Sequence, residues 1–294
     1  EHPADTWERF HGEIWTAAPV MAHAHLDGWD APSAQFRRAP FAAWVADLIS
    51  WRGAPGRMDP ALSAAAAAAE LAARGCGLAA VHVGETGAEG DPQAPLELLS
   101  WREVLDPFPI AGEAAGAAWL RQAAPCTGLA LHAPYTVDLD LARPVFARGG
   151  GTVSLHLGET EEERQLLAHG SGPLAELLME RRGRLSPRRF ASPVNWLAEA
   201  GGMHGGTLAV HGGALNVVEL RALHRAGVRI VFCPGTHAWF GRSEPSFAPA
   251  GVFPSALGCD SRASNECLDP LREFRLVLQQ LPAWGIPAAW EALT

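Results

Sequence analysis

The chain has 294 residues, which is enough for one large domain, since an eightfold α/β barrel alone takes about 250 residues. Its 48% hydrophobic and 19% charged residues exclude a disordered chain, and its formal net charge of -9 argues against a nucleic-acid or membrane-surface partner. No apolar run approaches the roughly 18 residues of a membrane span, and five cysteines without a Cys-x-x-Cys pair favour a reducing cytoplasm over a disulfide framework.

Short apolar runs alternate with longer helical stretches almost to the end of the chain. We expect strands at residues 20–26, 78–83, 108–111, 129–132, 152–157, 208–211, 228–232 and 256–260. We expect helices at residues 60–74, 113–122, 139–148, 174–182, 194–200, 217–226 and 270–280. Because strands without polar alternation are typical of a parallel sheet covered by helices, the pattern predicts an α/β fold, the (β/α)8 TIM-type barrel. The alternative, an open doubly wound sheet, normally has a glycine-rich phosphate turn after its first strand, and this chain lacks that motif.

Residues 28–59 form a long segment, rich in proline, arginine and aromatic residues, between the first expected strand and the first expected helix. Segments of this length inside a compact domain are usually lids or binding walls. A surface helix with an amphipathic face around residues 41–51 explains part of the aromatic content. Both interpretations stay open.

A strongly polar side chain ends five of the expected strands. The set comprises His23, His25, His132, His156, His211 and Asp260. In a barrel, side chains at the carboxyl ends of the strands point into one bowl. Neutral imidazole is the commonest nitrogen ligand for zinc and iron, so the shared position of these residues predicts a metal site.

The order of these motifs resembles that of the amidohydrolase superfamily, in its mononuclear deaminase branch. The resemblance spans residues 20–269 and rests on His-Ala-His at 23–25, His156 with Glu159, His211, and Asp260 followed by serine. It implies a metallo-dependent hydrolase built on a (β/α)8 barrel.

Two segments narrow the resemblance to the chlorohydrolase and nucleoside deaminase group. Residues 132–137 (His-Ala-Pro-Tyr-Thr-Val) and 257–265 are similar to that group, and the Ala-Ser-Asn at 263–265 is most similar to the aminodeoxyfutalosine deaminases of menaquinone biosynthesis. The resemblance implies a hydrolytic deaminase that acts on an aminopurine nucleoside like 6-aminodeoxyfutalosine and releases ammonia.

The chain departs from the family in two places. The family has Cys-Pro-x-Ser-Asn after its seventh strand, whereas residues 233–237 are Cys-Pro-Gly-Thr-His, so substrate contacts of that loop cannot be carried over. The family also flanks its barrel with a β-sandwich from both chain ends. We expect that sandwich to be absent or trimmed, and we predict a single catalytic barrel domain over residues 1–294.

The resemblance implies that His23, His25 and His156 supply nitrogen ligands and that Asp260 supplies an oxygen ligand, with an open position for water. Such a set suits Zn²⁺, with Fe²⁺ and Mn²⁺ as alternatives between which the sequence does not choose. Binuclear members of the superfamily bridge two metals through a carbamylated lysine. This chain contains no lysine, so one divalent metal ion is predicted.

Three residues are predicted to be catalytic. The resemblance places His211 where a histidine holds or deprotonates the metal-activated water, and Asp260 can also accept that proton. Glu159 corresponds to the acid that protonates the ring nitrogen and then carries a proton to the departing ammonia. The alternative for Glu159 is a charge at a helix N-terminus, because Glu161, Glu162 and Glu163 follow it.

The predicted substrate contacts depend most on the resemblance. His132 has two interpretations, a partner for a ribose hydroxyl or a residue that orients the site. His82 and Glu85 have two as well, substrate contact or core support. The full predicted set of substrate-binding residues is His132, Glu85, Arg102, His237, Trp239 and Arg242. In it, the arginines are candidates for binding a distal substrate carboxylate, and His237 and Trp239 are candidates for lining the base pocket.

Two other functions remain open. The same site can act on adenosine, S-adenosylhomocysteine, guanine or a triazine, or the barrel can be a non-catalytic metal-binding protein. The presence of both Glu159 and Asp260 favours an enzyme. A cytidine-deaminase-type site is excluded, because its His-x-Glu and Pro-Cys-x-x-Cys motifs are missing. The expected partners are a small-molecule substrate and a second copy of the chain in a homodimer.

Overall fold

The computed structural model describes residues 16–31, 33–84, 96–105, 128–148 and 151–294. Within them, eight parallel strands form one sheet whose spatial order follows the chain from β1 to β8. The strands are β1 (Val20–Ala24), β2 (Leu78–Val83), β3 (Glu97–Val104), β4 (Gly128–Leu131), β5 (Val153–Leu157), β6 (Thr207–His211), β7 (Arg229–Phe232) and β8 (Ala256–Leu257). The predicted α/β barrel is confirmed.

The sheet closes between its first and last strands. β8 is short, but Ala24 and Asp260 form a parallel bridge just beyond its end. Backbone hydrogen bonds run from His25 N to Asp260 O at 2.9 Å and from Cys259 N to His23 O at 3.0 Å. The closure therefore places residues that follow the first and the last strand next to one another, at the carboxyl ends of β1 and β8.

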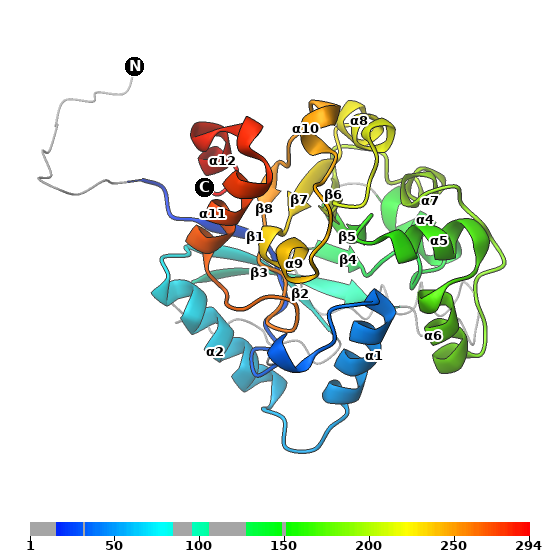
Figure 1. Cartoon of the computed structure of the whole chain (residues 1–294), viewed down its shortest axis with the longest axis horizontal. Helices are drawn as coiled ribbons and strands as arrows, with labels where there is room; N and C mark the ends of the chain where they lie inside the picture. The colour runs from blue at the N-terminus through cyan, green and yellow to red at the C-terminus, as the bar shows by residue number, and fades with distance from the viewer. Residues whose placement is uncertain (1–15, 32, 85–95, 106–127, 149–150) are drawn as a thin grey trace, which may run out of the picture.

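Helices surround the sheet (Figure 1). They are α1 (Phe41–Arg52), α2 (Pro60–Ala73), α4 (Leu139–Ala147), α5 (Glu161–His169), α6 (Pro173–Arg182), α7 (Pro193–Ala200), α8 (Val217–Arg225), α9 (Pro234–Trp239), α10 (Phe247–Ala250), α11 (Pro270–Gln280) and α12 (Ile286–Glu291), with short 3-10 turns at Ser33–Gln35 and Pro282–Trp284. Five of them, α2, α6, α7, α9 and α11, begin with proline, whose fixed φ and missing N–H suit the first helical position. α5, α6 and α7 end at glycines in the left-handed conformation.

The main apolar core lies between the strands and the helices. Every residue of β5 is buried, as expected for a strand of a parallel sheet. Large side chains such as Trp196 and Phe232 are almost fully buried, and each contributes about 1.5–3 kcal/mol through the hydrophobic effect. In the described part of the chain, no helix combines the length and the apolar character needed to cross a membrane.

The structure differs from the predicted elements in several places, and it contains four helices that were not predicted, α5, α9, α10 and α12. The expected strand at 108–111 and helix at 113–122 lie outside the described residues, and the third strand of the sheet is β3, which is absent from the predicted set. β3 escapes an apolar-run criterion because it contains Glu97, Ser100, Arg102 and Glu103. In the segment 28–59, the helix interpretation is correct for α1, which covers residues 41–52.

Candidate metal centre

Four side-chain atoms converge where β1, β5 and β8 end. His156 Nε2 lies 3.2 Å from His25 Nε2 and 3.3 Å from His23 Nε2. Asp260 Oδ1 lies 3.5 Å from His23 Nε2 and 3.8 Å from His25 Nε2. The structure therefore brings the four predicted metal ligands together.

The spacing and the protonation of these atoms fit a metal ion. Ligands at about 2.0–2.1 Å from a tetrahedral centre lie about 3.3 Å from each other, close to the separations found here. His156 Nδ1 lies 2.8 Å from the carbonyl oxygen of His132, which only accepts, so His156 carries its proton there and presents a bare Nε2 to the other rings. A cation among such lone pairs removes their mutual repulsion.

Burial sets the charge of the ligand set. Burial, followed by the charges of neighbouring histidines, lowers the pKa of His23 well below its usual value. Burial also lowers the pKa of His211 well below that value. Burial alone would raise the pKa of Asp260, but the nearby histidines, His211 foremost, lower it. His23 and His211 are thus neutral imidazoles and Asp260 is an ionised carboxylate, the protonation states that metal ligands require.

Two hydroxyls orient the carboxylate of Asp260. Thr236 Oγ1 donates to Asp260 Oδ2 at 3.0 Å, and Ser264 Oγ donates to the same oxygen at 2.9 Å. Oδ1 is left to face the histidines. Asp260 and His211 both have positive φ, 56° and 76°, which non-glycine residues adopt at a cost and which recurs at functional sites. Thr236 is a supporting residue that the sequence does not single out, although it occupies the Ser position of the family's loop motif.

Glu159 and His211 lie beside the ligand set and are both buried. Glu159 Oε2 lies 3.8 Å from His211 Nε2, and Glu159 Oε1 accepts a hydrogen bond from Arg242 Nη2 at 2.9 Å. His211 also belongs to a cluster with His23, His156 and Asp260 that could hold a metal ion. It is therefore a candidate ligand as well as a candidate base.

A tight turn directs Glu159 from the end of β5 into the bowl. Gly158 has φ 62°, and a Cβ at this position would lie 2.3 Å from Leu215 Cδ2, so the turn requires glycine. The backbone N–H of Glu159 donates to Glu163 Oε2 at 3.0 Å. Burial raises the pKa of Glu163 to about 8, so this carboxyl is mostly protonated at neutral pH.

A buried polar layer adjoins the ligand rings. His82 Nδ1 lies 3.2 Å from Glu103 Oε1, His82 Nε2 lies 2.8 Å from Ser154 Oγ, and the His82 ring centroid is 4.5 Å from that of His23. Burial alone would raise the pKa of Glu103, but His132 and His82 lower it well below its usual value. These contacts favour core support as the role of His82. Glu103 was not predicted because β3 was not predicted. Only the alternation of apolar and polar residues along β3 could have indicated that strand.

His132 contributes to the site in two ways. Its carbonyl oxygen fixes His156, as described, and its Nδ1 lies 2.6 Å from Thr136 Oγ1. Burial lowers the pKa of His132 to about 3, so the ring is neutral. This geometry fits the orienting interpretation, and contact with a ribose hydroxyl stays a prediction.

Three further predicted substrate residues, Arg102, His237 and Trp239, belong to the described part of the chain. Arg102 is next to Glu103 in β3, so its side chain points to the opposite face of that strand. His237 Nε2 donates to the carbonyl oxygen of Ser243 at 2.8 Å, and Trp239 is buried in an apolar cluster with Phe36. Glu85 lies outside the described residues. The substrate roles of these residues stay predictions.

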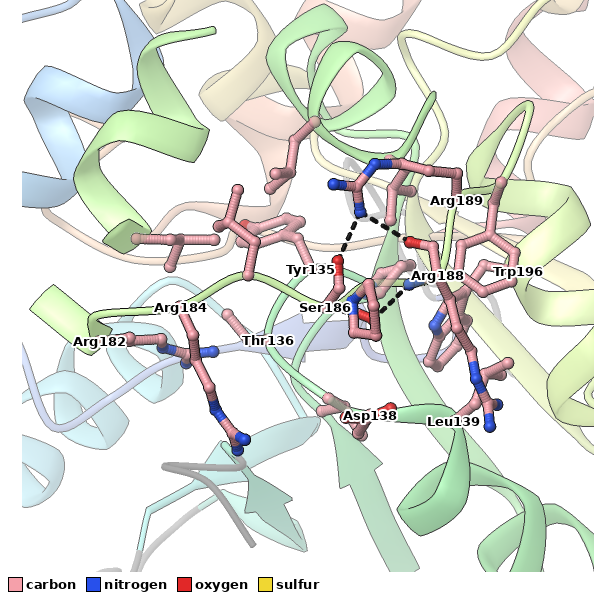
Figure 2. Close-up of a pocket in the computed structure, with 18 residues that line it drawn as sticks. Tyr135, Thr136, Asp138, Leu139, Arg182, Arg184, Ser186, Arg188, Arg189 and Trp196 are labelled. Carbon is pink, nitrogen blue, oxygen red and sulfur yellow. Dashed lines mark hydrogen bonds between the residues drawn. The ribbon is translucent and has the colours of Figure 1, made fainter. Parts of the chain in front are cut away.

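A hollow of about 100 Å³ lies beside the histidine cluster, and none of the four ligands lines it. Tyr135, whose ring centroid is 6.0 Å from that of His132, lines the hollow, as do arginines of α6 and the following loop. In Figure 2 the side chains of Arg182 and Arg184 lie on one side and that of Arg188 on the other, whereas Arg189 donates to backbone oxygens. These guanidinium groups do not converge on one point, so the hollow is not a formed anion site.

Comparison with proteins of known sequence gives relatives of one kind. No family model matches the chain. A 5-methylthioadenosine/S-adenosylhomocysteine deaminase of Pyrococcus abyssi is 32% identical over 161 residues, 50% of this chain and 32% of that protein. An aminodeoxyfutalosine deaminase of Nitratiruptor sp. is 27% identical over 153 residues, 51% of this chain and 37% of that protein. The resemblance predicted from the strand-end motifs is confirmed. The match spans about a third of the length of these curated relatives.

Solved structures share the fold of the chain. Helicobacter pylori aminofutalosine deaminase in complex with methylthio-coformycin gives a TM-score of 0.69 at 19% identity, covering 92% of this chain and 69% of that one. An adenosine deaminase from Xanthomonas campestris with bound zinc gives 0.66 at 21% identity, covering 94% and 65%. Both therefore share the barrel fold with this chain.

Proposed function

We propose that this chain is a metal-dependent aminohydrolase that deaminates an aminopurine nucleoside. One observation carries the proposal: three imidazoles and an oriented carboxylate converge beside a buried acid, with Glu159 Oε2 3.8 Å from His211 Nε2. A histidine cluster with only a structural role would not require a buried carboxyl group beside it. The single catalytic domain, the cytoplasmic location and the homodimer are parts of the same proposal.

His23, His25, His156 and Asp260 would hold the divalent ion. Zn²⁺ is proposed first because nitrogen-rich ligation with one carboxylate suits it, with Fe²⁺ and Mn²⁺ as alternatives. Structural neighbours whose names include bound zinc support this choice. When bound, such an ion supplies Lewis-acid activation of a water molecule.

The chain's own residues would move the protons. Asp260, ionised and held by two hydroxyls, and His211, neutral through burial, are placed to accept a proton from the attacking water. Glu159 would donate a proton to the ring nitrogen beside the amino-bearing carbon. The carbon gains the water oxygen, and Glu159, ionised by its first transfer, would take the remaining proton of that oxygen and pass it to the amine. The carbon–nitrogen bond then breaks to release ammonia, and the proton held by Asp260 or His211 would return Glu159 to its acid form.

For the substrate, we propose a nucleoside like 6-aminodeoxyfutalosine. The names of the relatives support adenosine-type nucleosides in general, including 5-methylthioadenosine and S-adenosylhomocysteine. Ammonia release measured across these compounds, adenosine, guanine and a triazine separates the candidates. If the zinc-loaded and the iron-loaded protein both release no ammonia from any of these compounds, the proposed function is contradicted.

Glu159→Gln tests the mechanism. We expect kcat to fall by about 10²–10⁴-fold, because the amide cannot donate the acid proton, while the bound metal measured by atomic emission stays at the wild-type level. His25→Ala is the matched comparison, since it removes a ligand and should lose metal and activity together. Normal turnover by Glu159→Gln would rule out the assigned acid.

A further inference from the structure

Arg242 contacts the proposed acid from outside the ligand set. It lies in the segment between α9 and α10, and its Nη2 donates to Glu159 Oε1 at 2.9 Å. The two side chains are only 15% and 8% exposed, so solvent screens their interaction weakly. Charge-assisted hydrogen bonds of this kind are shorter and stronger than neutral ones.

The guanidinium group of Arg242 is itself held by two elements. Its Cζ lies 4.3 Å from the ring centroid of Phe240, at the end of α9, and 5.8 Å from that of Phe41, at the start of α1. The backbone of Arg242 is held as well, because its backbone N–H donates to the carbonyl oxygen of His237 at 3.2 Å. Arg242 therefore has a fixed position from which to act on Glu159.

We propose that Arg242 is a positioning residue for the acid. By binding Oε1 it fixes the carboxylate so that Oε2 faces His211 and the ligand cluster, at the observed 3.8 Å. A glutamate without this partner has several rotamers open to it, and a displacement of about 1 Å from the reactive geometry can cost about 10²-fold in rate. The inference rests on the proposed function and adds a residue to it.

The test uses Arg242→Gln and Arg242→Ala in the metal-loaded full chain. We expect kcat for deamination to fall about 10- to 100-fold with KM changed less than about 3-fold, because the acid is misplaced while the pocket is kept. Guanidinium ion added to Arg242→Ala should restore part of its kcat. The same addition should not raise the kcat of Glu159→Gln.

Arg164→Gln is the matched control. Arg164 binds Glu219 at 2.7 Å, with 21% and 9% of the side chains exposed, so Arg164→Gln removes a similarly buried ion pair that contains neither Glu159 nor any of the four ligands. We expect its kcat to stay within about 2-fold of wild type. The inference would be overturned by an equal loss of kcat in this control or by an unchanged kcat in Arg242→Gln. A rise in KM alone in Arg242→Gln would also overturn it, and would make Arg242 a substrate-binding residue.

A second measurement does not depend on turnover. In a crystal structure of Arg242→Gln, we expect the Glu159 carboxylate to be turned away from His211, and an unmoved carboxylate would overturn the inference. If the wild-type protein releases no ammonia from any compound tested, the proposed function fails, while the position of Glu159 in the variant still decides the role of Arg242.

Discussion

Glu163 combines full burial with an ionisable group four residues after the proposed acid. One oxygen accepts the N–H of Glu159, while the other, Oε1, has no partner among the described residues. Burial raises its pKa from the ordinary 4.5 to about 8. Between these pH values the folded chain holds a proton that the unfolded chain has lost, so this group makes the protein less stable as pH rises through that window.

Glu163→Gln should therefore stabilise the protein at alkaline pH. The amide oxygen still accepts the N–H of Glu159, but no buried charge forms, so we expect a gain of about 1–3 kcal/mol at pH 8 and almost none at pH 4.5. Tm measured from pH 4.5 to 8.5 checks this, with the exposed Glu161→Gln as control. Parallel Tm curves for wild type and Glu163→Gln would contradict the raised pKa.

Single ligands could be predicted from the sequence, whereas their supporting residues could not. His23, His25, His156 and Asp260 each end an expected strand, so their convergence follows from the barrel alone. Arg242 lies in a loop, and its pairing with Glu159 depends on the path of the segment after α9. Loop paths leave no periodic pattern in a sequence, so the position of Arg242 needed coordinates.

At the scale of elements, α1 is anchored to α5, the helix that follows the proposed acid. The carboxylate of Glu162, in α5, accepts the N–H groups of Phe41 at 2.6 Å and of Ala42 at 3.0 Å, at the start of α1. These donors are among the N–H groups that a helix N-terminus leaves unpaired, and a negative charge there is favourable. The indole of Trp44 also donates to the carbonyl oxygen of Ala263, after β8, at 3.0 Å.

Glu162→Ala should loosen α1 without unfolding the barrel. We expect a loss of about 1 kcal/mol in stability and faster hydrogen exchange at the amides of Phe41 and Ala42, because their acceptor is removed. Hydrogen exchange followed by mass spectrometry measures this, with Glu161→Ala as the matched neighbour. Equal exchange of α1 in both variants would show that Glu162 does not anchor it.

The strands and helices differ in how well the sequence predicts them. β2 was predicted with its observed ends, because it is an apolar run between a glycine and a polar segment. β3 was missed because it carries charged residues on both faces, which is atypical of a barrel strand, and the partly buried Glu103 was missed with it. α1 was left open between loop and helix because it begins at Pro40-Phe41 without a side-chain cap.

Across the whole molecule, the proposed metal centre joins strands from separate parts of the barrel. Its ligands come from β1, β5 and the segment after β8, so a bound ion would connect elements that are distant in the sequence. An ion that binds only the folded chain stabilises it by mass action, by about 4 kcal/mol at a thousandfold excess over its dissociation constant.

Removing metal should therefore lower the stability of the entire barrel. We expect a chelator to lower Tm by roughly 10 °C and added Zn²⁺ to restore it, as follows for a domain of this size. Differential scanning calorimetry measures the change. The exposed His169→Ala should respond like wild type, and a His25→Ala protein should barely respond. A wild-type Tm indifferent to both treatments would exclude a structural contribution of the ion.

The bridge between Ala24 and Asp260 also determines when the ligand set can be completed during synthesis of the chain. His23 and His25 leave the ribosome more than two hundred residues before Asp260 and the hydroxyl of Ser264 that orients it. The complete ligand set exists only once the last strand has docked against the first. Completion of the proposed site would therefore follow synthesis of residue 260, and a chain interrupted before that residue would contain three of the ligand histidines and yet have no complete site.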